Sequence, residues 1–162
     1  MFSRLEFLWG APAIKFIDSI GRYFKNAPHL PDSIVSFMVS IAPWVAGLFG
    51  VLNTLGGLSA LGSVRGGTVL EGLSAQVGVT LDPNYLTIVG VLQVIIGALM
   101  LLAFTPLRQH SRRGWALLFW VTVIGLAQSV VGVVFGLGGI FGLVISTLIG
   151  FYILFEIRST YR

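Results

Sequence analysis

A few uncharged polar side chains lie inside the long apolar runs of this sequence, where they could bind a ligand or one another. The candidate polar cluster consists of Gln93, Gln128, Ser146 and Thr147. A glutamine amide that faced lipid would lack hydrogen-bond partners, so we expect these side chains to face the interior of a helix bundle. Hydrogen bonding between helices is the favoured interpretation. The alternative is a polar site for an ion, a small solute or water.

Other kinds of chemistry lack the residues that they need. No acidic or basic residue lies in the core of an apolar run, which argues against coupling to ions or protons. The chain has no cysteine, and its two histidines, His29 and His110, both lie outside the apolar runs. We therefore expect no metal site, no cofactor and no catalytic residues, and we predict that the protein is not an enzyme.

Small residues recur at every fourth position in two of the apolar runs. Such stripes let neighbouring helices approach closely. They indicate packing within one molecule or, alternatively, a surface for self-association. The candidate packing residues are Ala42, Ala46, Gly50, Gly142, Ser146 and Gly150.

The composition places these side chains in a membrane. The 162 residues are 56% hydrophobic and only 10% charged, whereas soluble domains carry about 25% charged residues. A helix needs about 20 apolar residues to cross a bilayer. We therefore predict an all-α fold, a four-helix transmembrane bundle over residues 31–162. Its spans are predicted at 33–55, 85–104, 115–135 and 140–155.

Residues that typically cap or break helices set the predicted limits of these spans. Asp82 and Pro83 are typical of an N-cap followed by proline in the first helical turn. Pro31 is predicted to break the chain and Asp32 to cap the first span, and Pro43 should kink this span. Thr105 and Pro106 are predicted to end the second span.

Two further helices are predicted outside the spans. Residues 11–26 alternate apolar and polar positions with helical periodicity, which indicates an amphipathic helix lying in the membrane surface. Residues 1–30 would form this interfacial segment on the cytoplasmic side. A short amphipathic helix is also predicted over about 68–78.

Basic residues fix the predicted orientation. The four-span arrangement puts every lysine and arginine except Arg65 on one side, and basic residues stay cytoplasmic. We therefore expect a multi-pass protein of the plasma (inner) membrane with both termini in the cytoplasm. The candidate contacts to lipid headgroups are Lys15, Arg22, Lys25, Arg108, Arg112 and Arg113.

Two functional hypotheses follow. The first is a non-enzymatic membrane subunit that acts through contacts with helices, lipids or partner proteins. The alternative is an oligomeric transporter or channel component for small solutes, lined by the polar residues near the midplane. Both name membrane lipids, a homo-oligomer or a larger membrane complex as partners, and neither involves nucleic acid.

Overall fold

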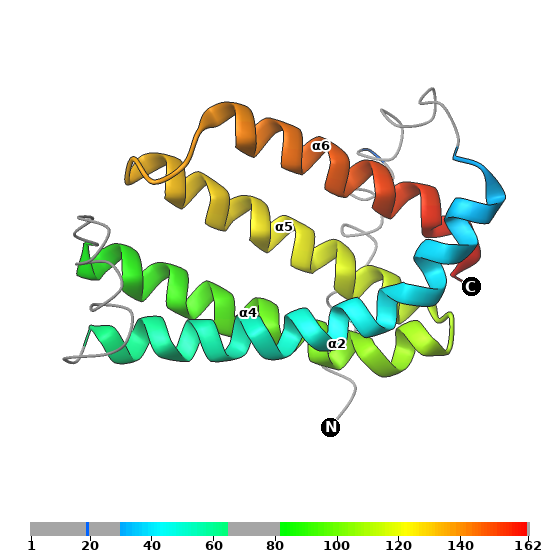
Figure 1. Ribbon diagram of the computed structural model, residues 1–162, viewed down its shortest axis with the longest axis horizontal. Coiled ribbons are helices and arrows are strands. Elements are labelled where there is room, and N and C mark those ends of the chain that lie inside the picture. The colour runs from blue at the N-terminus through cyan, green and yellow to red at the C-terminus, as the bar shows by residue number, and fades with distance from the viewer. Residues whose placement is uncertain (1–18, 20–29, 65–81, 162) are drawn as a thin grey trace.

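The computed structural model describes Ser19, residues 30–64 and residues 82–161, which form an all-helical structure. Four α-helices follow one another up and down along the bundle, and a short 3₁₀ helix follows the last (Figure 1). They are α2 (Asp32–Ser63), α4 (Pro83–Arg108), α5 (Arg112–Val134), α6 (Ile140–Glu156) and η2 (Ile157–Thr160). The predicted surface helices at 11–26 and 68–78 lie outside the described residues.

The chain ends α4 and α5 with the same type of turn. After α5, Gly136 takes a left-handed conformation with φ 72°, and the Leu137 N–H donates to the Gly132 carbonyl at 2.8 Å. After α4, His110 takes the corresponding conformation with φ 51°, and the Ser111 N–H donates to the Pro106 carbonyl. Both are Schellman turns, which satisfy the free carbonyls at a helix end.

The helix starts agree in part with the sequence. As predicted, Asp82 is the N-cap of α4, and its carboxylate accepts a hydrogen bond from the Asn84 N–H at 2.7 Å. Asp32 does not cap α2, because it is already the first helical residue and Pro31 occupies the cap position.

The predicted end of the second span at Thr105 and Pro106 is wrong, since α4 continues through Pro106 to Arg108. A proline removes one hydrogen bond and crowds the turn before it, yet the turn after it can still be helical. The first helix also runs beyond the predicted 55, to Ser63, and contains Pro43. Its N-terminal part bends away from the rest (Figure 1).

Three of the helices, α2, α4 and α5, are long and apolar enough to cross a membrane. The fourth, α6, is apolar but has 17 residues, which gives it a length of about 25 Å. Large apolar side chains are exposed on the outside of the bundle, with Phe141 at 85% and Val134 at 75% exposure. An apolar outer surface is what a lipid-facing bundle presents.

Helices α2 and α4 are packed backbone to backbone. A Cβ atom added at Gly57 would lie 2.7 Å from the Gly90 carbonyl oxygen, and one added at Gly97 would lie 2.7 Å from the Thr54 nitrogen. Glycine is required at these positions because any side chain would push the two helices apart.

The remaining helices pack in chain order, α4 on α5 and α5 on α6. The buried core is concentrated where the α4–α5 loop lies, around Leu107, Trp115 and Phe119. Here the Trp115 indole N–H donates to the Leu154 carbonyl at 2.7 Å and connects α5 to the end of α6. We call this the basic end, since every described arginine (Arg108, Arg112, Arg113 and Arg158) lies there. The opposite end, which holds the turn Phe135–Gly139, is the glycine end.

Candidate functional site

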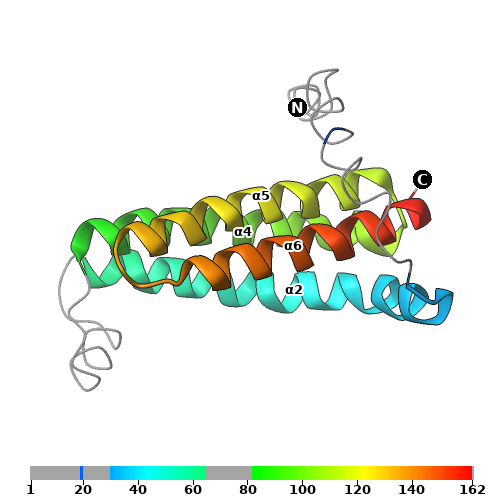
Figure 2. The same ribbon diagram turned by 90° about the horizontal axis from the view of Figure 1, so that it is seen from above.

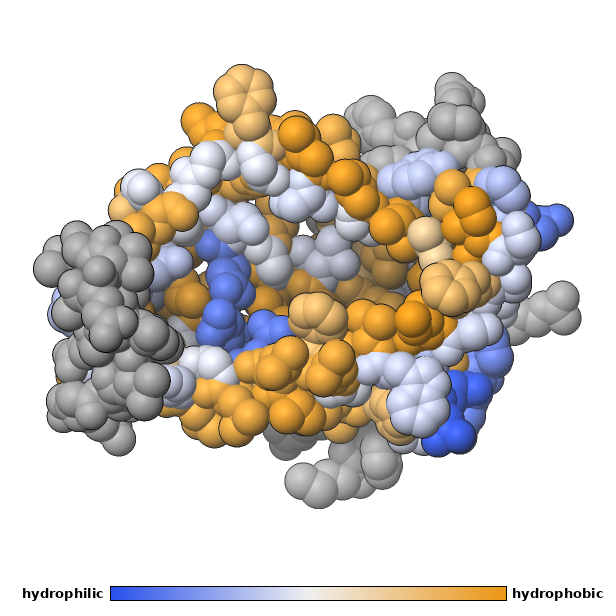
Figure 3. Space-filling model, in the orientation of Figure 1, coloured by the Kyte–Doolittle hydropathy of each residue, from blue (hydrophilic) through white to orange (hydrophobic). Residues whose placement is uncertain are grey.

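Helices α2 and α6 do not pack on each other along their lengths. Contact between the first and last parts of the bundle is made at the basic end, where η2 packs on α2. There the Leu30 N–H also donates to a carboxylate oxygen of Glu156 at 2.9 Å. Viewed from above, the four helices run side by side along the bundle (Figure 2). The face between α2 and α6 is hollowed (Figure 3).

This hollow, which we call the lateral groove, contains two pockets in succession along α5 and α6. The polar pocket has a volume of about 330 Å³ and lies at the glycine end. The apolar pocket has a volume of about 290 Å³ and lies closer to the basic end. Figure 3 shows hydrophilic side chains inside the hollow toward the glycine end and hydrophobic ones toward the basic end.

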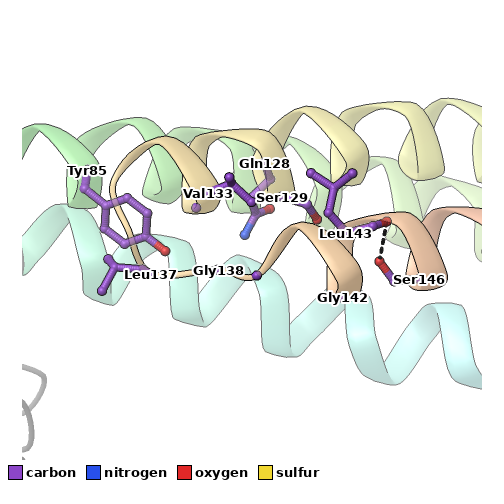
Figure 4. A pocket seen from close by; sticks show the side chains of 11 residues that line it. Tyr85, Gln128, Ser129, Val133, Leu137, Gly138, Gly142, Leu143 and Ser146 are labelled. Atoms are coloured by element: carbon purple, nitrogen blue, oxygen red, sulfur yellow. Dashed lines mark hydrogen bonds between the residues drawn. The ribbon is translucent and has the colours of Figure 1, made fainter.

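The polar pocket is enclosed by the last turns of α5, the glycine turn and the first turns of α6. Its polar side chains are Tyr85, Gln128, Ser129 and Ser146. The Gln128 amide and the Tyr85 hydroxyl are directed into it (Figure 4). Neither group has a hydrogen-bond partner among the described residues. The pocket therefore offers donors that nothing in the described chain satisfies.

The two serines offer the pocket acceptors and no donors, because each hydroxyl hydrogen already binds a backbone carbonyl of its own helix. The Ser129 hydroxyl donates to the Gly125 carbonyl at 3.0 Å, and the Ser146 hydroxyl donates to the Leu143 carbonyl at 3.2 Å. Each serine oxygen keeps free lone pairs, so it presents an acceptor to the pocket.

The apolar pocket receives side chains from all four helices. The one polar side chain that the described residues contribute is Thr122, whose hydroxyl donates to the Leu118 carbonyl of its own helix at 3.0 Å. No charged side chain of the described residues lines either pocket. The residues that line the apolar pocket include Met38 and Ile41 of α2, Met100 of α4, Leu118 of α5, Leu154 of α6 and Ile157 of η2.

The structure divides the predicted polar cluster. Gln128 and Ser146 line the same pocket. Gln93 does not line it: its side-chain oxygen lies 3.4 Å from the position of a Cβ at Gly56, so this amide points toward α2. Thr147 is half-buried and lines neither pocket.

The two predicted small-residue stripes also have different surroundings. In α2, Ala46 and Gly50 are buried, and a Cβ at Gly50 would lie 3.1 Å from the Leu101 nitrogen. Ala42 lines the apolar pocket. In α6, Gly142 has open space where a Cβ would be, and Gly150 would meet only Thr122, at 3.5 Å. The second stripe therefore forms the wall of the groove.

The predicted polar cluster leaves out two residues that line the polar pocket. Tyr85 is not in the predicted polar cluster, yet it lines the polar pocket, and its ring centre lies 5.4 Å from that of Phe135. Ser129 lies beside Gln128 in sequence, and this adjacency was the available signal.

Only some of the predicted headgroup contacts can be placed. Arg112 and Arg113 are exposed in the first turn of α5. The Arg108 guanidinium lies 5.8 Å from the ring centres of both Trp44 and Phe104 at the bundle surface. The other three, Lys15, Arg22 and Lys25, lie outside the described residues.

Comparison of the chain with protein-family models, curated proteins and solved structures finds no match. The geometry of the groove is therefore the basis for any functional conclusion.

Proposed function

We propose that this chain is a four-span membrane protein that acts by holding another membrane component in its lateral groove, without catalysis. The observation that carries the proposal is the open face between α2 and α6, which contains a Gln128 amide without a partner in the described part of the chain. An amide without a partner at membrane depth costs free energy, and a bound partner removes that cost.

The proposed setting is the plasma (inner) membrane, with both termini in the cytoplasm. The grouping of Arg108, Arg112, Arg113 and Arg158 at one end of the described bundle supports this orientation, because basic residues stay cytoplasmic. In this setting α6 is the fourth span, although its 17 residues cover less than the roughly 30 Å hydrocarbon core. The groove then opens sideways into the bilayer.

Transport of a small solute is the second candidate, and the polar pocket favours it. A solute that crossed the bilayer through the groove would next meet the apolar pocket, where Thr122 is the one polar side chain from residues 30–64 and 82–161. A polar solute would lose its hydration there without compensation. The lining of the two pockets therefore supports holding a ligand in the groove better than it supports passage of a polar solute across the bilayer.

Native mass spectrometry of the full chain from mild detergent tests the proposal. We expect the protein to retain a lipid or a second copy of the chain. Gly142→Leu should reduce this retention, because a side chain at position 142 projects into open groove and can be accommodated without disturbing the fold.

Phe141→Leu is the matched control, since Phe141 lies next to Gly142 in sequence but is 85% exposed. It should leave retention unchanged. A bare monomer in the wild type, or equal retention in both variants, would refute the proposed role of the groove.

A further inference from the structure

We infer that the lateral groove binds a neutral lipid consisting of a carbonyl-bearing ring on a long apolar chain, the chemistry of an isoprenoid quinone. The ring would occupy the polar pocket and the chain would follow the apolar pocket. This inference rests on the proposed function and specifies the component that is held. It concerns binding alone and involves no electron transfer.

The hydrogen-bonding groups of the polar pocket match carbonyl oxygens. Its free donors are the Gln128 amide and the Tyr85 hydroxyl, which both point into the pocket (Figure 4). A carbonyl oxygen accepts from such donors without carrying a charge. Two carbonyl acceptors on one uncharged ring would satisfy the two donors that the described chain leaves unpaired.

The charge distribution argues against an anionic phospholipid headgroup. Phosphate groups are commonly bound in proteins by arginine or lysine, and among the described residues no charged side chain lines either pocket. Every arginine among residues 30–64 and 82–161 lies at the basic end, whereas the polar pocket lies at the glycine end. The polar group that enters this pocket should therefore be uncharged.

The pocket volumes argue against a partner helix. A single helical turn about 10 Å across and 5.4 Å long fills more than about 400 Å³. Each pocket is smaller than this, at about 330 and 290 Å³. A cavity of about 150 Å³ already holds a benzene ring. The polar pocket is thus large enough for a substituted ring, and the apolar pocket for part of a chain.

The glycines of the polar pocket provide a flat wall for such a ring. Gly132, Gly138, Gly139 and Gly142 all line it. Three of them, Gly132, Gly139 and Gly142, have no atom within 4 Å of the position that a Cβ would take. The space that a side chain would fill is left open at each.

The test measures protection of a single cysteine. The natural chain has no cysteine, so Gly142→Cys carries the only thiol, close to the glycine end of α6. The variant is placed in phosphatidylcholine nanodiscs and labelled with a water-soluble maleimide. Decylubiquinone is the probe, because its fully substituted ring does not add thiols. We expect it to slow labelling at position 142 at least about tenfold, which corresponds to ~1.4 kcal/mol.

Two pairs of variants make the result specific. Phe141→Cys reports the same depth on the outer face of α6 and should show no protection. Adding Gln128→Leu to Gly142→Cys should raise the decylubiquinone concentration needed for half-protection by about tenfold. Gln93→Leu removes an amide that does not line the pocket and should leave that concentration unchanged.

Several outcomes would overturn the inference: no protection, equal protection at position 141, equal protection by phosphatidylglycerol, or no effect of Gln128→Leu. If Gly142→Cys fails to fold, a decylubiquinone adduct of the wild-type chain in native mass spectrometry replaces the assay, and its absence has the same meaning. If decylubiquinone gives no protection but native mass spectrometry still shows a retained component whose retention depends on Gly142, the inference about the ligand is wrong and the proposed function stands. Loss of all retention refutes that function as well.

Discussion

His110 and Gly136 occupy the same left-handed position in the two Schellman turns. Glycine adopts this conformation without strain, whereas histidine does not. A non-glycine residue in the left-handed region costs about 1–2 kcal/mol. We therefore expect His110→Gly to stabilise the protein by about 1 kcal/mol, although it loses the stacking of His110 on Tyr161 at 6.0 Å between ring centres. Thermal unfolding in mild detergent measures the change.

The adjacent residue provides the control for this prediction. Gln109 has φ −87°, so Gln109→Gly gains no relief of strain and should be neutral or destabilising. Equal effects of the two substitutions would show that the conformation of His110 carries no cost.

Tyr161 is 3% exposed, and its hydroxyl has no hydrogen-bond partner in the described part of the chain. Burial raises the pKa of this phenol above its ordinary value of 10.0. Below pH 10 the phenol is neutral in both states. As the pH rises above 10, the unfolded chain loses the proton first, so the free energy of unfolding should fall until the pH passes the folded pKa.

Tyr161→Phe isolates this contribution. It removes an unsatisfied buried hydroxyl, so it should be neutral or stabilising by about 1 kcal/mol near neutral pH. The alkaline loss of stability should also be smaller in the variant than in the wild type when both are unfolded in detergent between pH 9 and about 11. Parallel pH profiles for the two proteins would contradict the assigned cause.

At the scale of the helices, the glycines of α4 and α5 should respond oppositely to the same substitution. A Cβ at Gly97 would lie 2.7 Å from the Thr54 nitrogen and 2.8 Å from the Gly50 oxygen. We expect Gly97→Ala to destabilise the α2–α4 pair by about 1–3 kcal/mol.

Gly125→Ala is the matched variant, because a Cβ there would meet no atom within 4 Å. It should be neutral or stabilise by up to about 1 kcal/mol through helix propensity. Thermal unfolding of the two variants side by side measures the difference. A loss at Gly125 as large as that at Gly97 would mean that α5 packs more closely than the structure has it.

The positions of the helices could largely be predicted, because apolar runs and caps are local signals. Asp82 and Pro83 begin α4 as expected. The end of α4 was missed because Pro106 signals a break, whereas the chain turns only at His110. A left-handed histidine has no such local signature, since glycine is the residue that normally marks this position.

The site could be predicted only in part, because a sequence does not state which neighbour each helix face meets. Gln128 and Ser146, two members of the predicted polar cluster, line the same pocket. Helix α4 packs against both α2 and α5, and nothing local indicates that Gln93 points toward α2. Likewise, Gly50 and Gly142 belong to the two predicted stripes, yet a Cβ at Gly50 would meet the Leu101 backbone nitrogen and one at Gly142 would face open space.

At the scale of the whole molecule, the grouping of arginines predicts how the bundle is oriented. Single cysteines placed at Gln109 and Leu137 mark the basic and glycine ends, and both positions are exposed. A maleimide that cannot cross membranes should label Leu137→Cys in intact cells and should reach Gln109→Cys only after the cells are opened. The reverse pattern would invert the proposed topology.

The shortness of α6 has a consequence for the bilayer itself. In the proposed orientation, a helix of about 25 Å stands in hydrocarbon about 30 Å thick, so the surrounding leaflets must become thinner beside it. Each ångström of this deformation costs a fraction of a kcal/mol. The cost falls when two thinned regions merge or when the local membrane is already thin. Bilayer elasticity alone would then draw such molecules toward one another and toward thinner membrane domains, without any direct contact between their surfaces.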